Sequence, residues 1–255
     1  MKLYTTMLCL ITGCLLSVSI GQAEEIQEIR WATPEWQNIT NKDGTGLYNE
    51  ILDRIFEPHQ ITLIREYVPW KRALIMVAKG HADMTGGEDP DDQHLQATHP
   101  IVEVSQSVLF KRSVIPQWKG LESLKGRRGV WVHGYRSSAP AAITSVLLGR
   151  EVKSRVQAVL IVANDRGAEY YYDNSYQMMQ AIQQAGIPID LETTYQMEEV
   201  HIANLYWRFH DSDRGRQIRD LFDQGIERLY CSGELELIYG KWQSLFPTIY
   251  QIKCP

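Results

Sequence analysis

Two tryptophans lie where a predicted strand ends and a helix begins. Trp70 stands in the sequence VPWKRAL, after an alternating run over residues 61–67, and Trp36 follows a short apolar strand. Ligands of open α/β units bind outside the carboxyl ends of the strands. Indole faces stack on planar groups and attract cations. We therefore expect Trp36 and Trp70 to sandwich the body of a small planar or cationic molecule. The alternative for both is a packing role in the core.

Further candidates for ligand contact also follow predicted strands or lie near the end of the second predicted lobe. They offer backbone amides, hydroxyl groups or charges, and they are Thr85, Gly86, Tyr135, Arg136, Ser137, Asn164 and Glu192. Arg136 precedes a predicted helix, and both a guanidinium and a helix N-terminus attract anions. The sequence thus predicts an anion-binding corner around Arg136. A solvated turn is the alternative for each of these residues.

The first 23 residues have the pattern of a secretory signal peptide. Lys2 is the only charge before Glu24, an apolar stretch follows it, and small residues precede the bond after Ala23. We expect cleavage there and a periplasmic location. A lipoprotein signal ending at Cys14 is the alternative. The formal net charge of −5 gives no reason to expect a nucleic-acid partner.

Two cysteines remain beyond this leader, Cys231 and Cys254. In an oxidising compartment we expect them to form a disulfide that holds the C-terminal tail to the last helices. Histidines do not accompany them at metal-ligand spacing, so we expect neither a metal site nor a cofactor.

The elements that position these residues alternate between strand-like and helix-like segments. Strands are predicted over residues 29–32, 61–67, 82–84, 102–110, 129–132, 156–162 and 200–209. Helices are predicted from residue 46 and over 73–78, 139–148, 175–185, 218–229 and 235–242, with Asn174 as a cap. The pattern restarts after a break at 116–120, which indicates two mainly parallel α/β lobes.

Five segments, in order and spacing, resemble the extracellular solute-binding proteins of family 3, which serve polar amino acid uptake. They are GTGLYNEIL, VPWKRALIMVAKGHADM, THPI, WKGLESLKGRRGVWVHGY and GRQIRDLFDQGIERLYCSGELELIYGKW. The resemblance implies a type II periplasmic binding protein, with two lobes joined by two crossover strands. The first lobe would comprise residues 24–112 and 200–255, and the second 113–199. The implied function is capture of a small polar ligand for a membrane ABC transporter permease, by a monomer that is not an enzyme.

The acidic loop after the third predicted strand departs from the family pattern. Amino-acid-binding members carry an arginine there that clamps the ligand's α-carboxylate, whereas this loop carries Asp89, Asp91 and Asp92. An anionic ligand would then need Arg136 in the second lobe. If Arg136 is not used, a cationic ligand facing the acidic loop becomes the better interpretation.

Two other functions remain open on the same fold. One is a sensory role, in which the protein presents a ligand to a membrane signalling partner. The other is an enzyme resembling cyclohexadienyl dehydratases, for which Glu88 or Glu192 could serve as the acid, although no paired constellation supports it.

Overall fold

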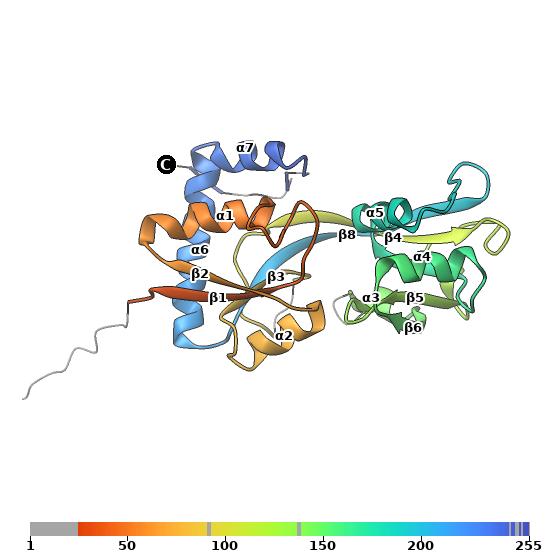
Figure 1. The fold of residues 1–255 in the computed structure, drawn as a ribbon, viewed down its shortest axis with the longest axis horizontal. Helices are drawn as coiled ribbons and strands as arrows, with labels where there is room; N and C mark the ends of the chain where they lie inside the picture. Colours follow the sequence, from red (N-terminus) through yellow and green to blue (C-terminus); the bar gives the residue numbers. More distant parts are fainter. Residues whose placement is uncertain are drawn as a thin grey trace, which may run out of the picture.

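The chain folds into two lobes that are joined by two long strands. The computed structural model describes residues 25–90, 93–136, 139–244, 246–247, 250 and 252–254, so the predicted signal peptide lies outside the described residues. Strand β4 (Val102–Lys111) leads out of the first lobe and strand β8 (Tyr195–Phe209) returns to it (Figure 1). The structure confirms the predicted type II arrangement, while the exact lobe boundaries stay a prediction.

Eight strands form one continuous sheet in the order β2-β1-β3-β8-β4-β7-β5-β6. The remaining strands are β1 (Glu28–Thr33), β2 (Thr62–Tyr67), β3 (Met84–Glu88), β5 (Arg128–Val132), β6 (Leu148–Val152) and β7 (Tyr170–Asn174). Strands within each lobe pair in parallel, β1 with β2 and β3, and β5 with β6 and β7. The crossover strands β4 and β8 run antiparallel to each other and to their neighbours β7 and β3. The carboxyl ends of the parallel strands in each lobe therefore point toward the junction between the lobes.

Helices cover the sheet in both lobes (Figure 1). The first lobe has α1 (Leu47–Phe56), α2 (Trp70–Ala78), α6 (Asp213–Cys231) and α7 (Glu234–Lys241), and the second has α3 (Ala141–Thr144), α4 (Arg155–Ala163) and α5 (Ser175–Ala185). Leu47, Ile51 and Ile55 are fully buried, as their helical spacing predicts. Trp31 of β1 meets Trp207 of β8 edge to face in the same core, with ring centroids 5.4 Å apart. This contact ties the returning strand to the first lobe.

Two of the predicted elements in the second lobe are wrong. Residues 156–162 were predicted as a strand but belong to helix α4, where Ala158, Val159 and Val162 form a buried helical face. A short continuous apolar run fits a buried helix as well as a buried strand. Of the helix predicted over 139–148, only the single turn α3 forms. Leu148, the last residue of the predicted helix, is instead the first residue of strand β6.

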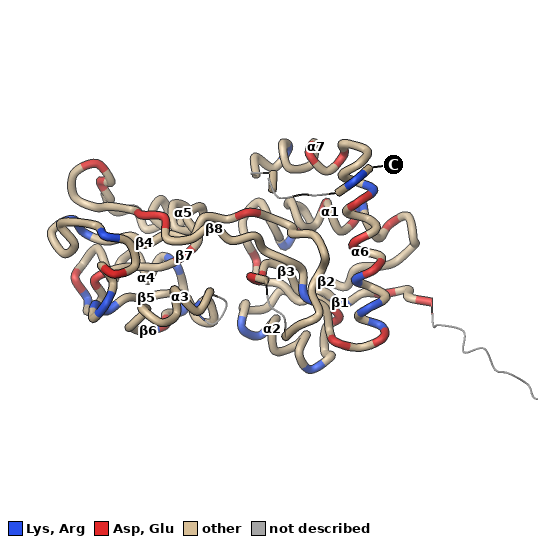
Figure 2. Tube along the Cα trace, turned by 180° about the vertical axis from the view of Figure 1, so that it is seen from behind, with Lys and Arg blue, Asp and Glu red and all other residues tan. Residues whose placement is uncertain are grey.

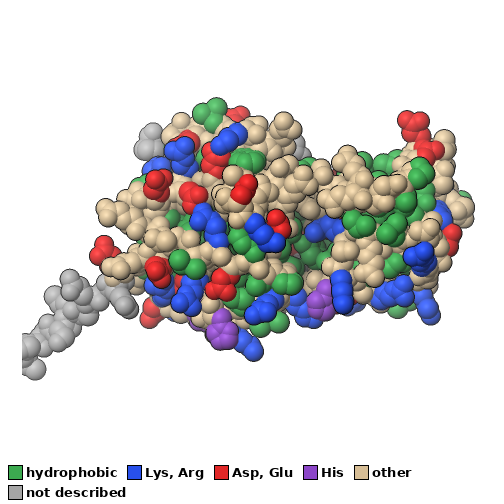
Figure 3. Space-filling model, viewed as in Figure 1, with side chains coloured by type: hydrophobic (Ala, Val, Ile, Leu, Met, Phe, Trp, Pro, Cys, Tyr) green, Lys and Arg blue, Asp and Glu red, His purple; other side chains and the backbone are tan. Residues whose placement is uncertain are grey.

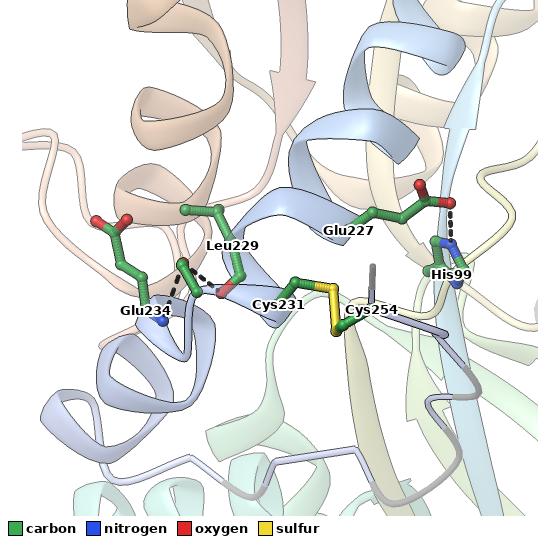
Figure 4. The surroundings of a disulfide bond; sticks show 7 residues. His99, Glu227, Leu229, Cys231, Glu234 and Cys254 are labelled. Carbon is green, nitrogen blue, oxygen red and sulfur yellow. Dashed lines mark hydrogen bonds and ion pairs between the residues drawn. A yellow bond between two sulfur atoms is a disulfide. The ribbon is translucent and has the colours of Figure 1, made fainter.

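The predicted disulfide is confirmed. Cys231 at the end of α6 is bonded to Cys254, with their Cα atoms 5.4 Å apart, and His99 contacts Glu227 one turn earlier on the helix (Figure 4). The tail also packs against the first lobe, since the Tyr250 hydroxyl donates to the Pro100 carbonyl oxygen at 2.7 Å. Among the described residues, no helix is long and apolar enough to cross a membrane.

Two helical glycines in the first lobe give a matched test of close packing. A methyl group added to Gly215 would lie 1.8 Å from the backbone oxygen of His210, whereas one added to Gly240 would meet none of the described residues within 4 Å. We expect Gly215→Ala to lower the free energy of unfolding by about 2 kcal/mol, because the turn that enters α6 must shift. Gly240→Ala should raise it by up to about 1 kcal/mol through helix propensity. Urea unfolding measures both changes, and equal effects of the two substitutions would contradict the packing argument.

Candidate ligand-binding site

A cavity of about 300 Å³ lies between the two lobes, beside the strands that cross between them. In the space-filling view the lobes are two masses separated by a notch (Figure 3). Residues from both lobes and from the crossover strand β4 line the cavity. The volume is at the lower end of the range for ligand pockets, which runs from about 300 to 1,000 Å³. The site therefore suits a small molecule.

Aromatic rings dominate the walls of the cavity. Those lining it are Trp36, Tyr48, Trp70 and Trp242 from the first lobe, and Tyr135, Tyr172 and Tyr176 from the second. Trp36 and Trp70 contact each other, with ring centroids 5.6 Å apart and planes tilted by 48°. The expected sandwich of a ligand between these two indoles is therefore wrong, because the rings form one corner. A ligand would meet this corner from one side.

The two lobes contact each other directly at the rim of the cavity. The Trp36 indole N–H donates to the Tyr135 hydroxyl at 3.0 Å, and the Asn38 side-chain amide donates to the Tyr176 hydroxyl at 3.2 Å. Tyr135 also packs against the small core cluster that contains Trp70. These contacts link the two lobes directly beside the cavity.

Arg155 and Asp173 form a buried ion pair on the second-lobe side. Arg155 is the first residue of α4, and its Nε lies 3.1 Å from an Asp173 carboxylate oxygen, whose side chain is fully buried. Its Nη2 donates to the Tyr135 hydroxyl at 2.7 Å. Burial lowers the pKa of the guanidinium, but the Asp173 carboxylate, with help from Tyr135 and Tyr171, reverses this and raises the pKa above its ordinary value. Arg155 thus stays charged beside the cavity.

The Asp173 carboxylate, near the end of β7, has several hydrogen-bond donors. Besides Arg155, it accepts hydrogen bonds from the Tyr171 hydroxyl and from the Asn174 backbone N–H, the latter at 2.8 Å. Asn174 in turn caps α5 by accepting from the Gln177 backbone N–H, as its sequence position predicts. A carboxylate with this many donors is a fixed counter-ion for Arg155.

Carboxyl groups line the first-lobe side. Asp89 follows β3 after an irregularity at Gly87, whose φ of 97° favours glycine. Among the described residues, one buried Asp89 side-chain oxygen has no hydrogen-bond donor, and the His201 Nε2 lies 3.7 Å from it. Burial, followed by the charge of Glu88, raises the pKa of Asp89 to about 7. Glu103 of β4 also lines the cavity.

The structure brings three of the predicted site residues to the cavity, namely Trp36, Trp70 and Tyr135. Five others lie elsewhere: Thr85 and Gly86 within β3, Arg136, Asn164 and Glu192. Gly86 packs on the Trp207 ring, and it is Gly87 that reaches the cavity. Ser137 lies outside the described residues, as do Asp91 and Asp92 of the acidic loop.

Three of these five have structural partners of their own. The Arg136 guanidinium donates to the Thr144 carbonyl oxygen at 2.9 Å and lies 5.9 Å from the Trp131 ring. Asn164 ends helix α4 and bonds the Leu160 carbonyl oxygen, so it lies at the end of α4 opposite Arg155. Glu192 is exposed in a turn, where its backbone N–H donates to Asp190 at 2.8 Å.

The most informative residues missed from the sequence are Arg155 and Asp173, whereas Asp89 was named there as part of the acidic loop. Asp173 had a usable signal, since it ends the tyrosine-rich run 170–172 directly before a capped helix, which is where α/β proteins place ligand-binding groups. Arg155 was hidden by the wrong strand prediction for 156–162. Among the described residues, no group of three or more His, Cys, Asp or Glu side chains is arranged to hold a metal ion.

Comparison with known proteins yields similarity in fold alone. A scan against protein-family models and a search of curated protein sequences found no match. Several solved structures are similar. One is a histidine kinase sensor domain with similarity to periplasmic binding proteins, at 18% identity and a TM-score of 0.69, covering 88% of this chain and 100% of that one.

Two further structures are amino-acid-binding proteins. A substrate-binding protein of an ABC uptake transporter from Streptococcus pneumoniae, with bound histidine, is 16% identical with a TM-score of 0.65, covering 85% of this chain and 92% of its own. An ancestral amino acid-binding protein, a precursor of cyclohexadienyl dehydratase, is 15% identical with a TM-score of 0.64, covering 85% and 95%. The chain therefore has the type II periplasmic binding fold of amino-acid-binding solute-binding proteins.

Proposed function

We propose that this protein is a periplasmic solute-binding protein that captures a small ligand between its lobes and delivers it to the permease of an ABC transporter. The observation that carries the proposal is the cavity of about 300 Å³ lined by rings from both lobes. We further propose that residues 1–23 are a signal peptide and that the protein acts as a monomer.

Closure around the ligand follows from the way the site is divided. The first lobe supplies the Trp36–Trp70 corner and Asp89, while the second supplies Tyr135 and the Arg155–Asp173 pair. Because neither lobe holds the whole site, a ligand that contacts both stabilises the closed arrangement over an open one. The crossover strands β4 and β8 are where such a hinge motion would bend.

A binding screen with two tryptophan variants tests the proposal. We expect some small molecule from a panel of amino acids, amines and organic acids to raise the melting temperature of the purified protein, since binding to the folded state stabilises it. For that ligand, Trp36→Ala should weaken binding by at least about tenfold, because it loses stacking area and the contact with Tyr135. Calorimetry gives the affinities.

The matched control is Trp118→Ala. Trp118 stacks on Phe110 at 5.3 Å in the second lobe and does not line the cavity. It should lower stability and leave affinity unchanged. Equal losses of affinity in the Trp36→Ala and Trp118→Ala variants would show that the ligand binds outside this cavity. If no compound of the panel raises the melting temperature, the result counts against the solute-binding function.

A sensory role is the second candidate, favoured by the similarity to a histidine kinase sensor domain. Crosslinking in cells distinguishes the two, because a transport protein should be captured with a permease and a sensory protein with a signalling receptor. The dehydratase alternative has less support, since neither Glu88 nor Glu192 lines the cavity and Glu88 is paired with Arg208 at 3.3 Å. A turnover assay with prephenate or arogenate tests it.

A further inference from the structure

Acidic side chains outnumber basic ones around the cavity once Arg155 and its partner Asp173 are counted as neutralising each other. Arg155 is the one Lys or Arg among the described residues that line the cavity, and its charge is balanced by the buried Asp173. Asp89 and Glu103 line the same cavity. In the charge-coloured trace, acidic positions also occur along the strands that cross between the lobes (Figure 2). Counted over Asp173 and the described residues that line the cavity, the formal charge is therefore negative.

From this balance we infer that the ligand is an organic cation with an aromatic or apolar body and without a carboxylate, such as an aromatic or quaternary amine. The inference rests on the proposed function and names the chemical class that the same cavity selects. Such a cation lacks the carboxylate that a zwitterionic amino acid carries.

Asp89 gives the cation a specific partner. Its buried side-chain oxygen has no hydrogen-bond donor among the described residues, and the cost of burying such an acceptor falls when a donor arrives. An ammonium group beside Asp89 would supply both the donor and the opposite charge. The ionisable groups that interact with Asp89 are Glu88 beside it, His201 from β8 and Tyr172 from β7. Arg208 is already paired with Glu88.

The aromatic walls suit the same class of ligand. Indole and phenol faces attract cations at distances up to about 6 Å from the ring centroid. The protein already uses this interaction, since the Arg155 guanidinium lies 4.8 Å from the Tyr135 ring. The Trp36–Trp70 corner, with Tyr48 and Trp242, offers further faces to a bound cation.

A carboxylate on the ligand would have no comparable partner among the described residues that line the cavity. It would have to share Arg155 with Asp173, and it would approach Asp89 and Glu103, which carry the same sign of charge. Like charges in a partly desolvated site repel strongly. The cavity therefore disfavours the carboxylate that distinguishes an amino acid from its amine.

Pairs of related ligands in which only one member carries a carboxylate give the decisive experiment. The pairs are tryptamine with tryptophan, tyramine with tyrosine, agmatine with arginine, and choline with glycine betaine, each titrated into the purified protein by calorimetry at pH 8. We expect at least one cation to bind, at least about tenfold more tightly than its carboxylated partner, which corresponds to the loss of one charge interaction. A carboxylated partner that binds as tightly as its cation would overturn the inference and leave the proposed function standing.

If no compound of the four pairs binds, the inference is overturned for these classes of cation. The proposed function is then judged separately by the wider panel described above. Binding of an organic acid or an amino acid from that panel would retain the function and reject the cation.

Two variants locate the charge that is recognised. Asp89→Asn keeps the size of the side chain and removes its charge, so it should weaken binding of the cation by at least tenfold. Asp165→Asn is the matched control, since Asp165 is an exposed partner of Lys111 outside the cavity, and it should bind as the unchanged protein does. Equal affinities for the Asp89→Asn variant and the unchanged protein would overturn the role of Asp89.

The pH dependence of choline binding separates a direct charge interaction with Asp89 from a purely structural role of that residue, which would not change with pH in this way. Choline carries a fixed charge, and Asp89 ionises around pH 7, so affinity should rise by up to about tenfold from pH 6 to 8. The His201 imidazole also faces Asp89, with its Nε2 3.7 Å from the carboxylate, so a His201→Gln variant serves as the control. The slope should persist in His201→Gln and vanish in Asp89→Asn. A slope that vanishes only in His201→Gln would overturn the assignment to Asp89.

Discussion

Replacing Asp173 with alanine should lower the free energy of unfolding by about 3 to 5 kcal/mol, the usual cost of leaving one partner of a buried ion pair without its counter-charge. The Asp173 side chain is fully buried, and the variant leaves the largely buried Arg155 guanidinium and the Tyr171 hydroxyl without their acceptor. Equilibrium unfolding in urea, followed by tryptophan fluorescence, measures the change.

Two further variants show whether the buried charge is responsible. Asp165→Asn removes the charge of an exposed partner of Lys111 and keeps a residue type that tolerates the left-handed backbone there (φ 52°), so it should cost less than about 1 kcal/mol. The double variant Arg155→Met with Asp173→Leu replaces both charges with apolar side chains and should recover most of the loss, because such replacements are often neutral. A double variant as unstable as Asp173→Ala would show that packing, rather than an unpaired charge, sets the cost.

Reduction of the Cys231–Cys254 bond should lower the free energy of unfolding by about 3 kcal/mol in the chain-entropy model, because the bond closes a loop between residues 23 positions apart. For a protein of this size, that corresponds to a fall in melting temperature of about 6 to 12 °C. Thermal unfolding with and without dithiothreitol measures the fall.

The control for the disulfide is a protein that lacks it. The double variant Cys231→Ser with Cys254→Ser should melt at the temperature of the reduced protein and should not respond to dithiothreitol. An unchanged melting temperature on reduction would mean that the contacts of Tyr250 with Pro100 and Tyr230 hold the tail without the bond.

The sequence predicted the fold well where its periodic signals were unambiguous. Helix α5 has the predicted bounds, including its Asn174 cap, because the cap and an amphipathic stripe agree. The prediction failed at α4, because its run of Val, Leu, Ile and Ala is apolar on almost every side and carries no period. Burial in the core, which only the assembled lobe provides, selects helix there.

The site was predictable only in part, for a physical reason. Trp36, Trp70 and Tyr135 follow strands, so the rule for strand ends finds them. Trp242 at the end of α7 and Tyr176 on α5 come from helices, and they reach the cavity through the way those helices pack. The pairing of Arg155 with Asp173, 18 positions apart, depends on α4 and β7 lying side by side. Local patterns in a sequence carry no record of such contacts.

The path of the chain through the two lobes has a consequence for the order of folding. The core of the second lobe is built from residues between 108 and 200, whereas the core of the first lobe joins Trp31 and Ile51 to Trp207, Phe222 and Ile226. Closing a longer loop costs more entropy, and distant contacts form more slowly. During synthesis or export, the second lobe can complete its core before the strand that finishes the first lobe has emerged. Until that strand and the helices after it emerge, the N-terminal part of the first lobe keeps apolar surface exposed, because its core partners are still missing. We therefore expect this part of the chain to depend most on a chaperone.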